Sequence, residues 1–165
     1  IARSENGLPK TFKKKLAMSC DVSPDSVVEA LDAATIYDVP MSFLRQNILK
    51  PIAKELELGD LQPDMEEWDK LVKKIVQPKG KVVIGFVGKY LALKESYKSL
   101  TEALIHAGAH LDSRVEICWV DSEEIEERDA QTLLGDCDGI LVAGGFGNRG
   151  VEGKIKAIEY ARVNK

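Results

Sequence analysis

The second half of the chain alternates short apolar runs with segments of helical periodicity. The apolar runs are KVVIGFVG (81–88), RVEICWV (114–120) and DGILVAGG (138–145), and a helical pattern follows each of them. Short continuous apolar runs are typical of strands buried on both faces, and strand–helix alternation is typical of a parallel sheet covered by helices. Residues 81–165 are therefore predicted to form a doubly wound, flavodoxin-like α/β domain.

Three helices are expected in this domain. One runs from about Lys94 to Ala109, and the segment EEIEERDAQTLLGDC (123–137) is predicted to be a short helix that is mostly exposed. The last helix follows the third strand. Its inner face is predicted from apolar residues at helical spacing, which are Val151, Ile155, Ile158 and Tyr160.

The first half of the chain has fewer clear elements. Residues 10–19 and 39–58 have helical patterns, and residues 26–33 fit either a strand or a short helix. Pro51 is expected to kink or divide the helix in which it lies, because proline lacks the N–H that a helix interior needs.

The chain is predicted to contain parts of two domains joined by a linker. Residues 1–58 have too few elements to close a core alone and are expected to be the end of a domain whose beginning is missing. Residues 59–80 are predicted to be the linker, with one amphipathic helix for which Asp64 is a fair N-cap. Residues 81–165 are expected to be the first part of the second domain.

Composition limits the classes of protein that the chain can represent. It is 44% hydrophobic and 30% charged, as is ordinary for a globular protein, and no apolar run approaches the length of a membrane span. Its net charge of −4 argues against nucleic-acid binding. Cys20, Cys118 and Cys137 have no CxxC spacing, so neither a disulfide framework nor a metal site is expected, and the predicted location is the cytoplasm.

A glycine-rich stretch, LVAGGFGNRGVEGK (141–154), follows the third predicted strand. Ligands bind at the carboxyl ends of strands in open parallel sheets, and glycines there let backbone N–H groups approach a ligand closely. Such donors suit either a phosphate or a developing oxyanion. The spacing fits neither the GxGxxG dinucleotide motif nor the Walker A loop. The plain alternative is a tight strand-to-helix turn without a ligand.

Three segments of the chain resemble the CTP synthase family. GILVAGGFGNRGVEGKIKAIEYAR (139–162) is similar to the segment that leads into the family's glutamine amidotransferase active site. The family's VGKY signature resembles residues 84–104, IGFVGKYLALKESYKSLTEAL. The end of the family's amidoligase domain resembles residues 16–40, LAMSCDVSPDSVVEALDAATIYDVP. The resemblance runs nearly end to end, so the chain is identified as an internal fragment of a CTP synthase, with residues 1–58 from the amidoligase domain.

The resemblance implies an activity and a set of ligands. CTP synthases are ligases of pyrimidine nucleotide biosynthesis that use ATP and Mg²⁺ to aminate UTP to CTP, with ammonia from glutamine and with GTP as allosteric activator. Glutamine, UTP, ATP and GTP are therefore the expected ligands, and a homotetramer is the expected assembly. The family's Cys-His-Glu triad and ATP loop lie outside the matched segments, so the fragment itself is expected to be inactive, without catalytic residues or metal ligands.

The resemblance also assigns roles around the glycine stretch. Gly145, with Gly144, matches the family's oxyanion hole, and Gly145 with Phe146 matches its glutamine-binding backbone. Ala143 departs from the proline that many members carry at this position. Further residues match positions linked to the lid and to GTP activation, and these are Arg149, Gly150, Glu152, Lys89, Tyr90 and Lys98.

Three residues of the first segment match nucleotide-binding positions. Lys15 aligns with a lysine that contacts UTP or CTP, and a cation suits a triphosphate. Asp32 and Ala33 align with the segment that borders ATP, where Leu31 replaces a residue that is frequently polar.

Two other classes of protein fit the residues. One is a stand-alone flavodoxin-like module that holds a nucleotide or anion at residues 144–147, which titration with glutamine and with GTP would distinguish. The other is a non-enzymatic assembly piece that uses the helices of residues 39–76 for oligomer contacts, which sedimentation would test.

Overall fold

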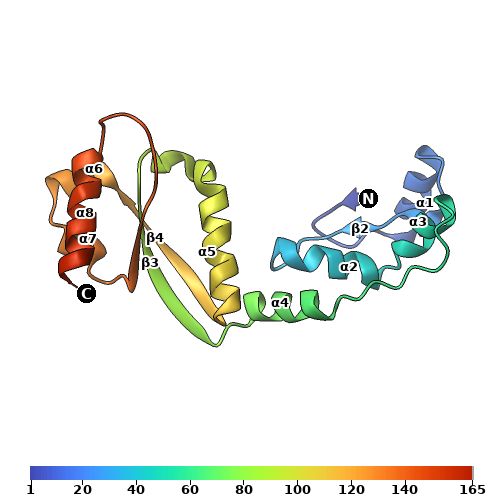
Figure 1. Ribbon diagram of the computed structural model, residues 1–165. Helices are drawn as coiled ribbons and strands as arrows, with labels where there is room; N and C mark the ends of the chain where they lie inside the picture. Colours follow the sequence, from blue (N-terminus) through green and yellow to red (C-terminus); the bar gives the residue numbers. More distant parts are fainter. Residues whose placement is uncertain (165) are drawn as a thin grey trace. The chain divides into compact units, whose positions relative to one another are not determined.

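The computed structural model describes residues 1–164, and the chain folds as two compact units. The first unit comprises Ile1–Val76 and the second Gln77–Lys165. Figure 1 shows the helices and strands of each unit, coloured along the sequence.

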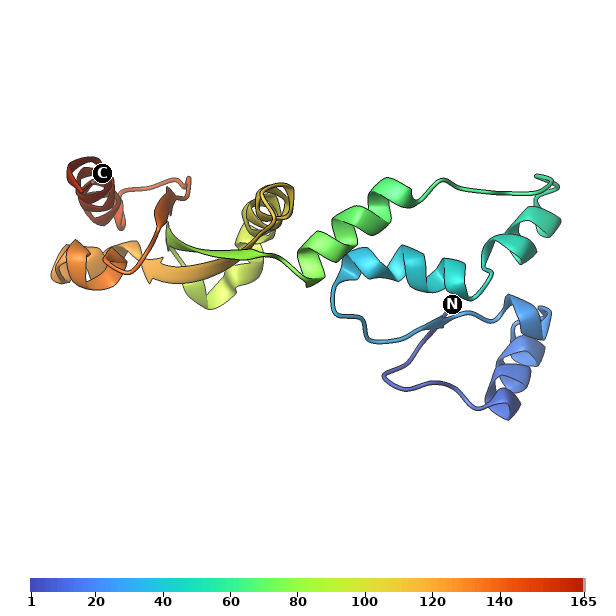
Figure 2. The same ribbon diagram turned by 90° about the horizontal axis from the view of Figure 1, so that it is seen from below.

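The second unit is built on a three-stranded parallel sheet. β3 (Gly80–Gly88) lies between β4 (Ser113–Asp121) and β5 (Gly139–Val142) and pairs with both in parallel. Figures 1 and 2 show α5 on one face of the sheet and α6, α7 and α8 on the other, which confirms the predicted doubly wound α/β fold. The bounds of these helices, in order, are Lys98–His110, Ser122–Glu127, Ala130–Leu134 and Val151–Val163.

The central strand β3 is buried on both faces. Successive residues of a strand point to opposite faces, and Phe86 and Val87 are each 0% exposed. The ring of Phe86 lies 5.0 Å from that of Tyr97 and 4.7 Å from that of Trp119, measured between centroids. Val87 belongs to a buried aliphatic cluster, whose other members are Val120, Ile125, Leu134 and Ala157.

The helix expected from Lys94 begins later than predicted. Residues Leu91–Tyr97 form a 3₁₀ helix, η3, and α5 starts at Lys98. The Tyr97 hydroxyl accepts a hydrogen bond from the Lys89 N–H at 3.0 Å and donates one to the Lys89 carbonyl at 2.7 Å. This contact folds η3 back onto the end of β3, so a continuous helix cannot start at Lys94.

The segment 123–137 forms two helices, and the expectation of one mostly exposed helix is wrong. The backbone of Arg128 and Asp129 is extended, so α6 and α7 are separate. Ile125 and Leu134 are 0% and 1% exposed because they cover one face of the sheet. The acidic residues around them hide this apolar contact in the sequence pattern.

The predicted inner face of α8 is wrong at two positions. Ile155 and Ile158 are 50% and 55% exposed, whereas the buried residues of α8 are Gly153 and Ala157. Small residues are required there because α8 packs closely on α6. A Cβ at Gly153 would lie 1.7 Å from the carbonyl oxygen of Ser122.

The first unit combines short helices with one pair of parallel strands. β1 (Ala2–Arg3) pairs with β2 (Glu29–Ala30). The α-helices are α1 (Lys10–Ser19), α2 (Val39–Arg45), α3 (Leu49–Glu55) and α4 (Glu66–Val76), and the 3₁₀ helices are η1 (Pro24–Ser26) and η2 (Ile36–Asp38).

The helix predicted over 39–58 is divided one turn before Pro51. The break follows α2, and Asn47 has a left-handed φ of +58°. In a continuous helix the ring of Pro51 would clash with the carbonyl of Asn47, four residues earlier. The break removes this clash and places Pro51 in the first turn of α3, where its missing N–H has no helical partner to lose.

Helix α4 packs within the first unit. The indole N–H of Trp68 donates to the Tyr37 carbonyl at 2.8 Å. Just before the helix, the Asp64 carboxylate accepts a hydrogen bond from the Glu66 N–H at 3.0 Å. The boundaries of the linker over residues 59–80 stay a prediction.

Replacing Gly153 by alanine is expected to destabilise the chain, although alanine is the better helix former by about 1 kcal/mol. The added Cβ would overlap the Ser122 carbonyl, and an overpacked contact of this kind typically costs about 1–3 kcal/mol. Urea unfolding measures the change. Glu159→Ala, on the exposed side of α8, is the matched control and should shift stability by less than about 0.5 kcal/mol. An unchanged or higher unfolding midpoint for Gly153→Ala would contradict the described packing.

Candidate functional site

The carboxyl ends of the three strands of the second unit meet at one edge of the sheet. Lys89 and Tyr90 follow β3, Ser122 follows β4, and residues 143–150 follow β5. The last of these segments, the glycine loop, is the arch that joins β5 to α8 in Figure 1. Open parallel sheets bind ligands at this edge.

Lys89 holds one side of the glycine loop. Its side chain is only 5% exposed, and its ammonium donates to the carbonyls of Phe146 and Gly147 at 3.1 and 3.0 Å. A lysine is rarely this buried unless its charge has partners, and here the partners are peptide oxygens of the loop.

Lys154, in the first turns of α8, holds the other side of the loop. Its ammonium donates to the Ala143 carbonyl at 2.7 Å and, at 3.5 Å, to that of Gly144. Burial lowers the pKa of Lys154, and the nearby charge of Lys89 lowers it further. The two lysines therefore bind the loop from two different elements.

The N–H groups of the glycine loop remain available to a ligand. Among residues 1–164, the N–H groups of residues 144–147 have no hydrogen-bond acceptor. A Cβ at Gly144 would meet nothing within 4 Å, and one at Gly145 would meet only the Lys154 ammonium, at 3.5 Å. The Phe146 side chain is fully exposed. The loop can thus offer donors to a negatively charged or strongly polar atom.

Arg149 links all three strand ends. Its guanidinium pairs with both carboxylate oxygens of Glu123, with 2.7 Å between Nη2 and Oε2, and lies 5.1 Å from the centre of the Tyr90 ring. The hydrogen bond from Arg149 lowers the pKa of the Glu123 carboxyl. The planar guanidinium donates two hydrogen bonds to one carboxylate while it lies over a ring, and the single ammonium of a lysine could not do both.

Both the backbone conformation and the close packing at position 150 require glycine. It has a left-handed φ of +67°, and a Cβ there would lie 2.2 Å from the Ser122 hydroxyl oxygen. That hydroxyl is buried and has no hydrogen-bond partner among the described residues. Glu152 follows in the first turn of α8, where a carboxylate is favourable, and is exposed.

Lys98 and the residues predicted to bind nucleotides make contacts within their own units. Lys98 begins α5 and pairs with Glu102 at 2.8 Å, which raises the pKa of the lysine. In the first unit, Lys15 is exposed on α1, and Asp32 pairs with Arg3.

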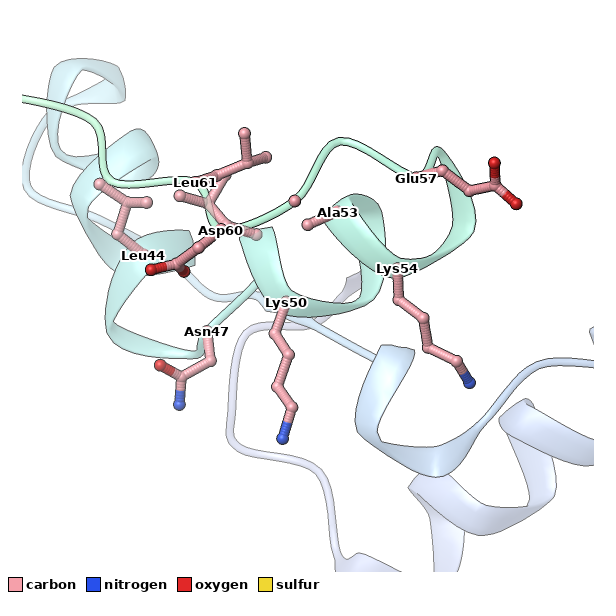
Figure 3. A pocket seen from close by; sticks show the side chains of 10 residues that line it. Leu44, Asn47, Lys50, Ala53, Lys54, Glu57, Asp60 and Leu61 are labelled. Carbon is pink, nitrogen blue, oxygen red and sulfur yellow. The ribbon is translucent and has the colours of Figure 1, made fainter.

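Two hollows are found in the first unit. One, of about 720 Å³, lies against α3 and the segment that follows it, and Figure 3 shows Lys50 and Lys54 extending from α3 beside it. The other, of about 760 Å³, has several lysines of α1 and α3 in its wall. Lys15, Asp32 and Ala33 are not among the described residues that line either hollow.

Neither a metal site nor a membrane span is found in the part of the chain that the structure describes. Residues 1–164 contain no group of three or more His, Cys, Asp or Glu side chains placed to hold a metal ion. No helix among them is long and apolar enough to cross a bilayer.

Sequence reasoning missed Lys154 and Glu123. Lysine and glutamate near a helix start usually indicate a solvated surface, so neither residue carried a signal by itself. Lys154 could have been found from its distance along the chain, because it lies one helical turn beyond the end of the glycine loop.

Family models match both ends of the chain. One described as glutamine amidotransferase class-I matches residues 92–165, and one described as CTP synthase N-terminus matches residues 1–58. The CTP synthases of Sulfurimonas denitrificans and Nautilia profundicola are 83% and 62% identical to the chain over its whole length. The chain spans 30% and 31% of the length of these two curated relatives. A solved glutaminase domain of Trypanosoma brucei CTPS with bound acivicin is 46% identical, covers 50% of this chain and 33% of that one, and has a TM-score of 0.45.

Together, the parallel sheet, the glycine loop and the family match define the second unit as part of a class-I glutamine amidotransferase domain. The match of residues 1–58 to the CTP synthase N-terminus, and the relatives that align with the whole chain, then indicate the family. The chain corresponds to a part of a CTP synthase.

Proposed function

We propose that the chain serves a CTP synthase that hydrolyses glutamine and uses the ammonia, with ATP, to aminate UTP to CTP. Relatives of that name match the whole chain, and the two family models divide it between a synthase and an amidotransferase part. The observation that carries the proposal is the glycine loop at the ligand-binding edge of the sheet, where the N–H groups of residues 144–147 have no acceptor among residues 1–164.

In this proposal the glycine loop stabilises the charge that develops on glutamine. A cysteine thiolate attacks the carbon of the side-chain amide, and the amide oxygen becomes negative. The N–H of Gly145, with that of Gly144 beside it, donates to this oxygen. The C–N bond then breaks, and the nitrogen takes a proton from the general acid of the triad and leaves as ammonia. Water hydrolyses the resulting thioester to glutamate and frees the cysteine. Phe146 and Gly145 contribute backbone to glutamine binding.

The cysteine that attacks glutamine is assigned to a part of the enzyme outside this chain. Burial, and then the neighbouring Cys118, raise the pKa of the Cys137 thiol to about 11, so little reactive thiolate forms there near neutral pH. Cys20 lies in the first unit, just after α1. The histidine and glutamate of the triad are likewise assigned elsewhere.

We assign the response to GTP to the cluster that joins the strand ends. Arg149, Gly150 and Glu152 form the lid side, and Tyr90 supplies a ring beneath the Arg149 guanidinium. The buried Lys89 would act indirectly, through the loop that it holds. Lys98 is assigned to coupling between the two domains on the resemblance alone.

Lys15, Asp32 and Ala33 are proposed to serve nucleotides in the first unit. The exposed ammonium of Lys15 can meet the triphosphate of UTP or CTP. The Asp32 carboxylate already pairs with Arg3, so backbone atoms of Asp32 and Ala33 are the better candidates for contact with ATP. A homotetramer in the cytoplasm is proposed from the family alone.

Gly145→Ala tests the central assignment. The glycine has an ordinary φ, and a Cβ would make only a normal contact at 3.5 Å, so alanine fits the fold and obstructs only the ligand. In the full-length enzyme, glutamine-dependent synthesis should fall on the order of a hundredfold, while ammonia-dependent synthesis is largely kept. Gly7→Ala, which also makes only an ordinary contact, is the control. Equal losses with glutamine and ammonia would show that Gly145 is a folding residue.

Arg149→Ala tests the regulatory assignment. The full-length variant should show weaker activation of glutamine hydrolysis by GTP and an almost unchanged ammonia-driven rate, because the change touches the lid and not the N–H donors. Glu123→Gln should act in the same direction, since it weakens the pairing of Arg149. Arg162→Ala, an exposed arginine near the end of α8, is the control. A GTP activation curve for Arg149→Ala that overlays the wild type would rule the assignment out.

A further inference from the structure

We propose that Lys154 is a positioning residue that aims the N–H groups of Gly144 and Gly145 at the substrate oxygen, with Lys89 as its counterpart on the other side of the loop. This inference rests on the function proposed above and concerns a residue that had no predicted role.

The geometry of the peptide group connects the lysine to the donors. In a trans peptide the C=O of one residue and the N–H of the next point in opposite directions. The Lys154 ammonium holds the carbonyls of Ala143 and Gly144, and the N–H groups of those two peptides are those of Gly144 and Gly145. Drawing the carbonyls to Lys154 therefore turns both N–H groups away from it.

Lys89 has the same effect one peptide beyond Gly145. It holds the carbonyls of Phe146 and Gly147, whose peptides carry the N–H groups of Gly147 and Asn148. Of the five carbonyls of residues 143–147, that of Gly145 is the one to which neither lysine donates. The loop is thus fixed on both sides of the glycine that is proposed to bind the oxyanion.

Stability alone does not account for Lys154. A cation in the first turns of a helix opposes the helix dipole, and burial of this ammonium disfavours its charged form. The buried residues of α8 are Gly153, which packs on Ser122, and Ala157, which belongs to the aliphatic cluster, and Lys154 is not among them. Sequences depart from such local preferences chiefly at functional sites. A positive charge beneath the loop also favours negative charge on the substrate oxygen above it.

The test compares lysine-to-methionine variants of the full-length enzyme. Lys154→Met and Lys89→Met keep the apolar stem and remove the donor. Lys156→Met is the matched control, because Lys156 lies on the same helix and also donates to a carbonyl, that of Glu126 at 2.9 Å, away from the loop. The measurements are kcat and KM for glutamine hydrolysis, the ammonia-dependent rate, and the unfolding midpoint.

Lys154→Met should lower kcat for glutamine about tenfold, less than the loss of a direct donor, with little change in KM. Its ammonia-dependent rate and unfolding midpoint should match those of Lys156→Met. A kcat equal to that of Lys156→Met, or an equal loss with both nitrogen sources, would overturn the proposal. If the wild type releases no ammonia from glutamine, the proposed function fails. A crystal structure of Lys154→Met then still decides the positioning role, because an unchanged Gly144–Gly145 peptide would refute it and a rotated one would support it.

Discussion

The conformation of the glycine loop depends on two lysine ammonium groups that donate hydrogen bonds to its carbonyl oxygens. The ammonium groups of Lys89 and Lys154 lose contact with water, and hydrogen bonds to carbonyls of the loop compensate for this loss. Hydrogen bonds to charged groups are stronger than those between neutral ones, so these contacts can hold backbone that lies outside any helix or strand. The parallel sheet makes the arrangement possible, since it brings the end of β3 beside the loop that follows β5.

The position of Lys154 follows from the close packing of α8 on α6. Ser122, at the start of α6, lies so near Gly150 and Gly153 that neither position has room for a Cβ. Glycine at both sites lets α8 begin directly against the residue that follows β4. Lys154 comes immediately after Gly153. The left-handed φ of Gly150 turns the chain from the loop into the helix. The position of Lys154 relative to the glycine loop therefore depends on two glycines that pack against Ser122.

The sequence predicts the sheet well and the helix contacts poorly. The runs around Phe86, Val120 and Leu141 are mainly apolar, as is typical of strands covered on both faces, so strands and sheet type were predictable. On α8 the contact is made by Gly153 and Ala157, whereas hydrophobicity pointed to Ile155 and Ile158. Close approach of two helices selects small residues, which leave no apolar signal. Within the site, the glycine loop was visible in the sequence, but Lys154 was not, because the sequence does not show whether a lysine is solvated or contacts backbone carbonyls.

In the proposed mechanism, the N–H of Gly145 donates a hydrogen bond to the oxygen of the glutamine side chain. A crystal structure of the full-length enzyme with a glutamine analogue in the site measures this contact directly. We expect about 2.7–3.1 Å between the Gly145 nitrogen and the oxygen that mimics the oxyanion. An analogue bound with that oxygen on other donors, and with the Gly145 N–H directed away from it, would show that Gly145 does not stabilise the oxyanion.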